Sequence, residues 1–336
     1  MLKLLAKDGI LRRIIEAASA APSIHNTQPW RFTVVADDLL EVCADPDRAL
    51  WVADPHARAL YMSCGAALFN IRTAIRMTGF NPLVWPLPQP RFSPMVLAAV
   101  QAEPGRPPSF AEREMYEAIW QRHTNRGPFT DEQIPDSVQV ALEHAAGFEF
   151  ATLRMLNAGE AERVIELAAR TDAELAADID HQIELQSWIA TGSNDDGIPA
   201  AALPPTPSRE PSPVRAADLT SAAPTIQRPT ANYEASPQLA VLTTARDEPA
   251  DWLRAGQALQ RVLLTATAHG LSASFLYQSI ELHDMRGDAA PAWPWHENPQ
   301  IVLRLGYGQQ AVATPRRPLD DVLTRMAAEQ NLPKQP

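Results

Sequence analysis

Lysine and cysteine are scarce in this chain of 336 residues. Its only lysines are Lys3, Lys7 and Lys334, so arginine carries almost all of the positive charge, for which genomic base composition is the simplest reason. Two cysteines, Cys43 and Cys64, cannot build a disulfide framework. The first residues carry charges where a signal peptide would need an uninterrupted apolar run. We therefore expect a protein of the reducing cytoplasm.

The chain also lacks a long hydrophobic run and an excess of positive charge. No stretch approaches the roughly 18 uncharged apolar residues that a membrane helix requires, so we expect no membrane span. Asp and Glu number 40 against 29 Lys and Arg, which gives a formal net charge of −11. Such a charge repels a phosphate backbone, and we expect no nucleic-acid binding. The length and the 46% hydrophobic content are typical of a globular protein with one large or two smaller packing units.

The order of apolar and polar residues suggests that one structural unit occurs twice. Residues 254–271 align with 63–80, which pairs Gly65 with Gly256 in two predicted buried helices. A short amphipathic helix followed by a strand precedes each of them. We therefore expect two repeats, at 1–105 and 106–336, joined by a linker at 101–111. The expected elements of the two repeats are helices at 11–21, 58–78, 111–122, 136–146 and 319–328, and strands at 30–35, 39–43, 95–100, 151–156, 272–279 and 301–308.

The second repeat is longer than the first. Glu16 and the matching Glu143 are 127 residues apart, whereas Gly65 and Gly256 are 191 apart, so 64 extra residues lie before the second buried helix. The excess falls on 161–190, which has the pattern of one long amphipathic helix, and on 192–230, which is rich in Pro, Ser and Ala. Such a segment is either a functional flap or disordered. We refer to residues 180–230 as the insert and expect them to form a lid.

The loop at residues 22–29, which we call the clamp loop, has the sequence PSIHNTQP. A proline at each end restrains it, and it offers a hydroxyl, two carboxamides and backbone amides. These groups can hydrogen-bond the edge of a flat heteroaromatic ring. The alternative is an ordinary polar stop after a helix. The candidate ligands in the clamp loop are Pro22, Ser23, Ile24, Asn26 and Gln28.

A second candidate site is the sequence RHTNR at residues 122–126, which we call the arginine motif. Arg122 and Arg126 are four residues apart and enclose His123 and Thr124, an arrangement that suits a phosphate monoester. Arginines of this kind are otherwise simply solvated at a surface. The histidines show no metal-binding spacing, and the chain has neither a Gly-x-Gly-x-x-Gly nor a Walker A sequence.

These stretches together resemble the nitroreductase superfamily. The sequence Pro-Ser-x-x-Asn-x-Gln-Pro-Trp at 22–30 resembles the loop that these flavoproteins place over FMN. The arginine motif, followed by Phe129, resembles their Arg-His-Ser-x-Lys/Arg-x-Phe sequence, which holds the FMN phosphate and the pyrimidine edge. Arg316 and Arg317 match a basic pair that reaches the same phosphate. With its insert, the chain is most similar to the Acg family, in which two nitroreductase units are fused.

The resemblance implies an α+β fold in which the two repeats form a pseudo-dimer that binds FMN. The backbone of Tyr277 or Gln278 is expected near flavin N5, although relatives often have Glu-Gly there. Only the first repeat has the clamp loop and only the second has the arginines, so we expect one FMN per chain. No catalytic side chain is expected, because flavin N5 carries the hydride.

The implied activity is hydride transfer from NAD(P)H to a nitroaromatic, a quinone or another small acceptor. Two alternatives remain open at this point. One is a flavin storage or sequestration protein in which the insert covers the ring, and the other is a scaffold that has lost flavin. The pseudo-dimeric chain is expected as a monomer or a homodimer.

Overall fold

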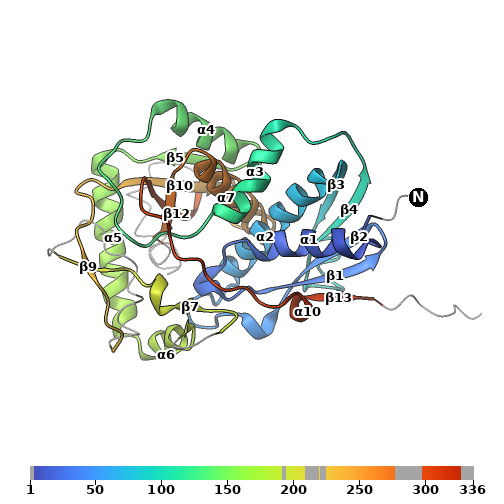
Figure 1. Cartoon of the computed structure of the whole chain (residues 1–336). Coiled ribbons are helices and arrows are strands. Elements are labelled where there is room, and N and C mark those ends of the chain that lie inside the picture. Colours follow the sequence, from blue (N-terminus) through green and yellow to red (C-terminus); the bar gives the residue numbers. More distant parts are fainter. Residues whose placement is uncertain (1–3, 191–193, 209–218, 220–224, 277–296, 327–336) are drawn as a thin grey trace, which may run out of the picture.

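The computed structural model describes residues 4–190, 194–208, 219, 225–276 and 297–326, and these residues form two main β-sheets with helices packed between and around them (Figure 1). The first sheet has the order β13-β1-β2-β4-β3 and the second the order β11-β12-β10-β5. The strands of the first sheet are β1 (Trp30–Ala36), β2 (Leu39–Ala44), β3 (Phe80–Pro86), β4 (Val96–Pro104) and β13 (Leu323–Arg325). Those of the second are β5 (Thr152–Met155), β10 (Gln238–Thr244), β11 (Ser272–Phe275) and β12 (Asn298–Gly306).

The two sheets repeat one topology, which confirms the duplication expected from the sequence. The order β1-β2-β4-β3 corresponds strand for strand to β5-β10-β12-β11. A helix precedes each set, and a twenty-residue helix separates its second and third strands. These helices are α1 (Asp8–Ser19) and α2 (Arg58–Met77) in the first unit, and α4 (Asp136–Gly147) and α7 (Pro249–Ala268) in the second. The fold is therefore α+β, as expected.

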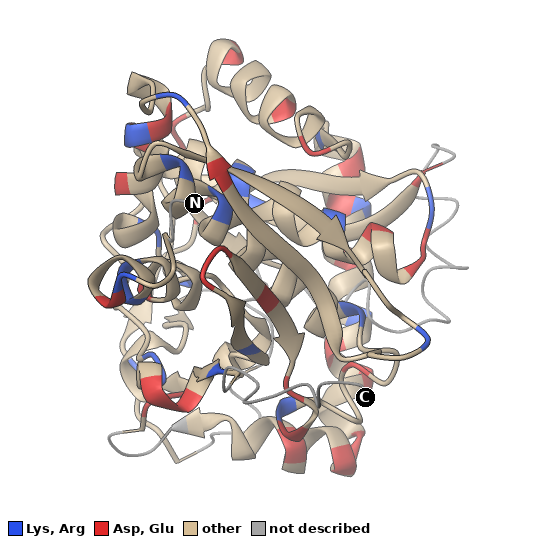
Figure 2. Ribbon diagram, turned by 90° about the vertical axis from the view of Figure 1, so that its right-hand side faces the viewer, with Lys and Arg blue, Asp and Glu red and all other residues tan. Residues whose placement is uncertain are grey.

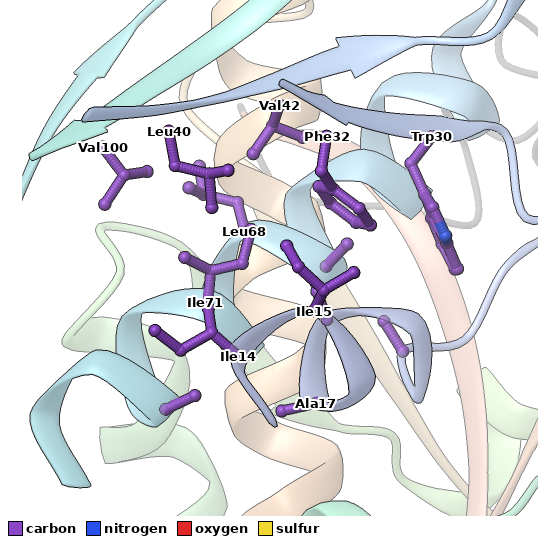
Figure 3. Packing of buried hydrophobic residues seen from close by; sticks show 14 of the residues in the cluster. Ile14, Ile15, Ala17, Trp30, Phe32, Leu40, Val42, Leu68, Ile71 and Val100 are labelled. Atoms are coloured by element: carbon purple, nitrogen blue, oxygen red, sulfur yellow. The ribbon is translucent and has the colours of Figure 1, made fainter. Parts of the chain in front are cut away.

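The core of the first unit lies between its sheet and α1 and α2. Ile14 and Ile15 of α1 point toward Phe32 of β1 and Leu68 of α2, and all four are fully buried (Figure 3). Their spacing on α1 is the helical period that the sequence shows. In Figure 2 the strands carry few charged residues, while basic and acidic side chains are interspersed on the helices and loops around them.

The helices α2 and α7 cross at the centre of the molecule, where Gly65 contacts Gly256. A Cβ added to Gly65 would lie 3.1 Å from the Cα of Gly256 and would overlap the carbonyl oxygen of Leu253. A Cβ on Gly256 would overlap the carbonyl oxygen of Met62. Glycine at both positions lets the two backbones touch, so the pair that the sequence alignment matched is the point at which the two units meet.

Three segments differ from the sequence-based expectation. Strand β4 extends to Pro104, and its residues 98–104 pair with the whole of β3. Residues 101–104 therefore belong to the sheet and not to a linker. The helix expected at 161–190 is two helices, α5 (Ala158–Ala177) and α6 (Ile179–Ser187), because the carboxylate of Asp178 caps α6 by accepting from the backbone N–H of Asp180 and His181. The helix expected at 111–122 is present as α3 (Phe110–Gln121), which lies between the two units in the chain.

The prediction of a helix at 319–328 is also wrong, because the helix is much shorter. It ends after one turn, α10 (Leu319–Val322), and continues as β13, which pairs in parallel with β1 at Phe32 and Leu323. The buried side chain of Val322 anchors the crossing. In Figure 1 this red strand lies beside the blue β1, so the end of the second repeat returns to the first sheet and carries residues 315–317 past the clamp loop.

The described part of the insert adds α6 and several short elements. They are β6 (Ile189–Ala190), β7 (Ile198–Pro199), β8 (Thr206–Pro207), β9 (Thr230–Ala231) and the 3-10 helix η3 (Ala200–Ala202). A small core of its own, which includes Leu185, Ile198 and Leu219, holds these elements together.

Replacement of Gly256 by alanine is expected to lower the free energy of unfolding by about 1–3 kcal/mol, because the added methyl group forces α2 and α7 apart. Thermal unfolding of the full chain measures this change as a lower Tm. The matched control is Gly9→Ala in the exposed part of α1, where nothing lies within 4 Å of the new Cβ. The control should be neutral or slightly stabilising, since alanine favours helix. Equal Tm values for the two variants would contradict the close crossing.

Candidate functional site

The clamp loop follows α1 and has a strained backbone conformation. It contains the 3-10 helix η1 (Ile24–Asn26), and His25, Asn26 and Gln28 have positive φ angles of 47°, 57° and 50°. Such backbone conformations cost on the order of 1–3 kcal/mol each and persist only where their surroundings hold them. Ser23 provides part of that support, because its Oγ accepts from the N–H of Gln28 at 2.9 Å and its carbonyl accepts from the N–H of Asn26 at 3.1 Å.

The carboxamides of the clamp loop bind protein groups in this structure. Nδ2 of Asn26 donates to the carbonyl oxygens of Gly197 at 3.0 Å and Pro315 at 3.1 Å. Nε2 of Gln28 donates to the carbonyl of Asp195 at 2.9 Å, and its Oε1 accepts from the N–H of Arg317 at 2.9 Å. Both side chains therefore join the clamp loop to the insert and to segment 315–317. The ring-edge contacts expected of Asn26 and Gln28 stay a prediction.

The guanidiniums of buried Arg122 and half-buried Arg316 lie side by side, and neither forms an ion pair among the described residues. Both donate to the carbonyl of Ala20 at 3.2 Å, and Arg316 also donates to Ala21 at 3.3 Å and to Oδ1 of Asn26 at 3.1 Å. The Nε atoms of both arginines are buried and lack a hydrogen-bond partner among the described residues, where neither side chain forms an ion pair. Burial lowers the pKa of Arg122 to about 9, with a smaller effect of Arg316, and lowers that of Arg316 to about 10.

A buried cation that lacks a counter-ion is costly, and a pair of them favours an anionic ligand. The half-buried side chain of His123 lies beside the pair, and all three line one pocket that also contains Trp120. Burial lowers the pKa of His123, and the two arginines lower it further. Arg316 connects the clamp loop to the arginine motif beside this pocket, because it contacts Asn26 and shares the Ala20 carbonyl with Arg122.

Arg317 lines the same pocket as Arg122 and Arg316 but differs from them in having a carboxylate partner, and its expected role as a phosphate ligand stays a prediction. Its guanidinium lies 3.3 Å from the buried carboxylate of Asp45, which also pairs with Arg31 at 2.9 Å. It donates as well to the carbonyl of Gln28 at 3.2 Å. The side chain therefore helps to fix segment 315–317 to the first unit, and it shares the single charge of Asp45 with Arg31.

The rest of the arginine motif runs beside β11. The backbone N–H of Asn125 donates to the carbonyl of Ala273 at 2.9 Å, and its side chain donates to Oγ of Ser272 at 3.2 Å. Further along, Arg304 of β12 packs over the ring of Phe129, at 3.9 Å, and ion-pairs with buried Glu234. These contacts fix the direction of Thr124 and Arg126. The expected N5-facing positions Tyr277 and Gln278 lie outside the described residues.

Thr124 and Arg126 reach a cavity between the two units, which we call the interface cavity. It is lined mainly by apolar and small polar side chains from both repeats and from the insert. Arg126 makes one long hydrogen bond, to the carbonyl of Ala202 at 3.4 Å, and burial lowers its pKa to about 10. The lining residues are Pro22, Ser23, Ile24, His25, Met62, Ser63, Ala66, Thr124, Arg126, His181, Ile198, Leu219, Leu259, Ser274, Phe275 and Ile301.

Sequence reasoning did not find two parts of this lining. Met62, Ser63 and Ala66 were assigned only to a buried helix, although they line the cavity, where the small side chains of Ser63 and Ala66 leave space. His181 was not singled out, because an isolated histidine on a helix carries no signal in the sequence. Its place at the cavity depends on the path of the insert across the first repeat.

The insert is fastened over the interface cavity by polar contacts to the first repeat. The carboxylate of Glu184 accepts from the N–H groups of Val52 at 3.1 Å and Ala53 at 2.8 Å. Arg48 forms an ion pair with Asp196 and lies over the ring of Trp188, 5.3 Å from its centre. With the bonds to Asn26 and Gln28, these contacts hold His181, Ile198 and Leu219 against the cavity.

Two searches of the described residues bear on other kinds of site. In those parts of the chain, no group of three or more His, Cys, Asp or Glu side chains is placed to hold a metal ion. None of the described helices is both long enough and apolar enough to cross a membrane.

Comparisons with known proteins place these features in a family. The sequence profile of the Nitroreductase family matches residues 7–54, which contain the clamp loop. A Mycobacterium tuberculosis protein named provisionally as the NAD(P)H nitroreductase acg is 30% identical over 93% of this chain and 95% of its own length. A second protein of that organism with the same provisional assignment, Rv3131, is 31% identical over 93% of this chain and 90% of its own.

Among solved structures, the FMN-dependent nitroreductase NfnB of Mycobacterium smegmatis in complex with NADPH is 15% identical, with a TM-score of 0.40 over 65% of this chain and 99% of that one. A nitroreductase of Desulfitobacterium hafniense with bound FMN is 16% identical, with a TM-score of 0.40 over 64% and 98%. The identity to acg extends over nearly the full length of both proteins, so the chain belongs to the nitroreductase family and is similar to Acg.

Proposed function

We propose that this protein binds one FMN per chain and transfers hydride from NAD(P)H to a nitroaromatic, a quinone or another small acceptor. The observation that carries the proposal is the buried, unpaired pair Arg122 and Arg316, which the arginine motif connects to the interface cavity. The names of the M. tuberculosis relatives, which are provisional NAD(P)H nitroreductases, support the same activity.

The residues present fit the chemistry of FMN. The free Nε atoms of Arg122 and Arg316 provide charge-assisted donors for a phosphate, and such bonds contribute about 1.5–3 kcal/mol each. The interface cavity offers apolar walls for a flat ring and the hydroxyls of Ser63 and Thr124 for polar atoms. When bound, FMN supplies a hydride acceptor and donor at N5. Arg126 holds a positive charge at the cavity wall, where it would stabilise negative charge on a ring.

The position that corresponds to the interface cavity on the other side of the crossing of α2 and α7 is occupied by side chains, which supports a single site per chain. Ala66, the residue after the crossing glycine of α2, lines the interface cavity. The matching residue of α7 is Gln257, whose Oε1 accepts from Arg72 at 2.8 Å. Arg72 also binds the carboxylate of Glu149 at 2.6 Å, and Arg261 binds it at 2.8 Å. Paired charges therefore fill the position at which a symmetric second cavity would lie.

A second candidate function is favoured by the position of the insert. His181, Ile198 and Leu219 lie against the interface cavity, and the bonds of Glu184 and Arg48 fasten the insert in that position. A ring beneath it would be covered on one side, which would exclude nicotinamide and favour storage of flavin. The rate at which NADPH reduces bound FMN separates this alternative from the oxidoreductase.

Replacement of Arg122 by alanine is expected to weaken FMN binding by about tenfold to a hundredfold, the loss of one charge-assisted contact to phosphate. Riboflavin, which lacks the phosphate, should bind the variant and the original chain equally well. Fluorescence titration with both ligands gives the Kd values. The matched control is Arg163→Ala on the exposed side of α5, which should change neither. An equal loss for riboflavin would show that the phosphate lies elsewhere.

The purified chain, saturated with FMN and freed of excess ligand, is expected to hold about one flavin per chain, because only one composite site is complete. Release of the flavin with acid and its absorbance, compared with the protein concentration from amino-acid analysis, gives the ratio. A value near two would contradict the single site, and a value near zero after reconstitution would leave the degenerate scaffold as the better account.

Replacement of Glu184 by alanine is expected to speed the reduction of bound FMN by NADPH several-fold. The change removes two hydrogen bonds of a carboxylate to the first repeat and so favours an open insert. Anaerobic stopped-flow absorbance measures the rate with NADH and with NADPH. Glu166→Ala on α5, which is exposed and away from the insert, is the control. A rate unchanged by Glu184→Ala would mean that the insert does not limit access.

A further inference from the structure

His181 is a buried polar side chain at the wall of the interface cavity. It lies on α6 of the insert, is 3% exposed, and lines the interface cavity. Its Nδ1 atom is buried and has no hydrogen-bond partner in the described part of the chain. An unsatisfied buried nitrogen destabilises the fold, so its retention at a cavity wall is typical of a group that meets a ligand.

Three basic side chains from separate segments converge on this cavity. His25 comes from the clamp loop, Arg126 from the arginine motif and His181 from the insert. Burial, with smaller effects of His181 and Arg126, lowers the pKa of His25 to about 3, which indicates that the three groups are close. Burial also lowers the pKa of His181. At neutral pH the histidines are therefore uncharged, and Arg126 is the cation.

No acidic side chain lines the described part of the cavity wall. The two carboxylates nearest to His181 on its own helix are engaged elsewhere. Asp178 caps the helix by accepting from Asp180 and His181 backbone N–H groups, and Glu184 accepts from the backbone of residues 52 and 53. The cavity therefore offers a guanidinium and two imidazoles without a negative partner.

We propose that His181, His25 and Arg126 form a subsite for the carboxylate of a small aromatic acceptor, with His181 as the residue that selects for it. The inference rests on the proposed function, since the acceptor would be reduced at the adjacent flavin. The apolar side chains of Ile24, Ile198 and Phe275 fit the aromatic body of such a molecule. The phosphate of FMN is provided for separately by Arg122 and Arg316, so the two histidines are available to a second anion, and the charge of Arg126 at the cavity wall would face both the ring and the carboxylate.

Benzoate and benzamide test this subsite, because they have nearly the same shape and differ in charge. Isothermal calorimetry measures both on the full chain, once with FMN bound and once without, in the absence of nicotinamide. We expect benzoate to bind the original chain at least about tenfold more tightly than benzamide. His181→Leu should reduce this preference to less than about threefold, while the FMN content stays the same.

Two further variants separate a contact from a structural role. His181→Asn places an amide N–H near the position of Nδ1 and should restore part of the preference for benzoate. His269→Leu, an exposed histidine after α7, is the matched control and should leave both Kd values unchanged. Tm values of all variants show whether the substitutions disturb the fold.

The outcomes distinguish this inference from the proposed function. Equal binding of benzoate and benzamide, or a preference that survives His181→Leu, would overturn the subsite even if FMN binds normally. Release of FMN by benzoate would also overturn it, because the basic groups would then belong to the cofactor site. A chain that binds no FMN but prefers benzoate through His181 would refute the proposed function and leave the carboxylate subsite standing.

Discussion

The close crossing of α2 and α7 is the constraint on which the composite site depends. Each repeat has a clamp-loop position after its first helix and a strand edge near its buried helix, but neither has a full set of functional side chains. Backbone contact between Gly65 and Gly256 brings the clamp loop of one repeat within reach of the arginine motif of the other. A larger residue at either glycine would separate the units and open the cavity between them.

The end of the chain completes what the crossing begins. After β12 the chain leaves the second unit, passes the clamp loop and joins the first sheet as β13. The ion pair of Arg317 with buried Asp45 fixes this path, and it places the neighbouring Arg316 against Arg122. One of two adjacent arginines thus meets a buried carboxylate, and the other forms no ion pair among the described residues. Identical side chains acquire different roles because of the carboxylate that only one of them meets.

The sequence was sufficient to predict the duplication, the α+β class and the two segments that meet at the cavity, because these rest on periodicity and on short motifs with fixed spacing. It could not separate Arg316 from Arg317, since the partner Asp45 is distant in the chain. It also could not show that one turn of helix at Leu319 would give way to β13, because the pairing with β1 forms only in the folded protein. His181 was missed for the same reason, as its significance comes from where the insert lies.

The carboxamides of Asn26 and Gln28 link the clamp loop to the insert, and this restricts the contacts that either segment can make. An amide side chain has two N–H donors. Both donors of Asn26 are used, for Gly197 of the insert and for Pro315, and Gln28 donates to Asp195 of the insert and, at 3.5 Å, to the carbonyl of Asn26. A hydrogen bond from either amide to a ring edge therefore requires the loss of one of these bonds. The same N–H donors can bind either the insert or the edge of a ring, but not both. The position of the insert and the contacts of the clamp loop to a ring are therefore coupled, because the number of donors is limited.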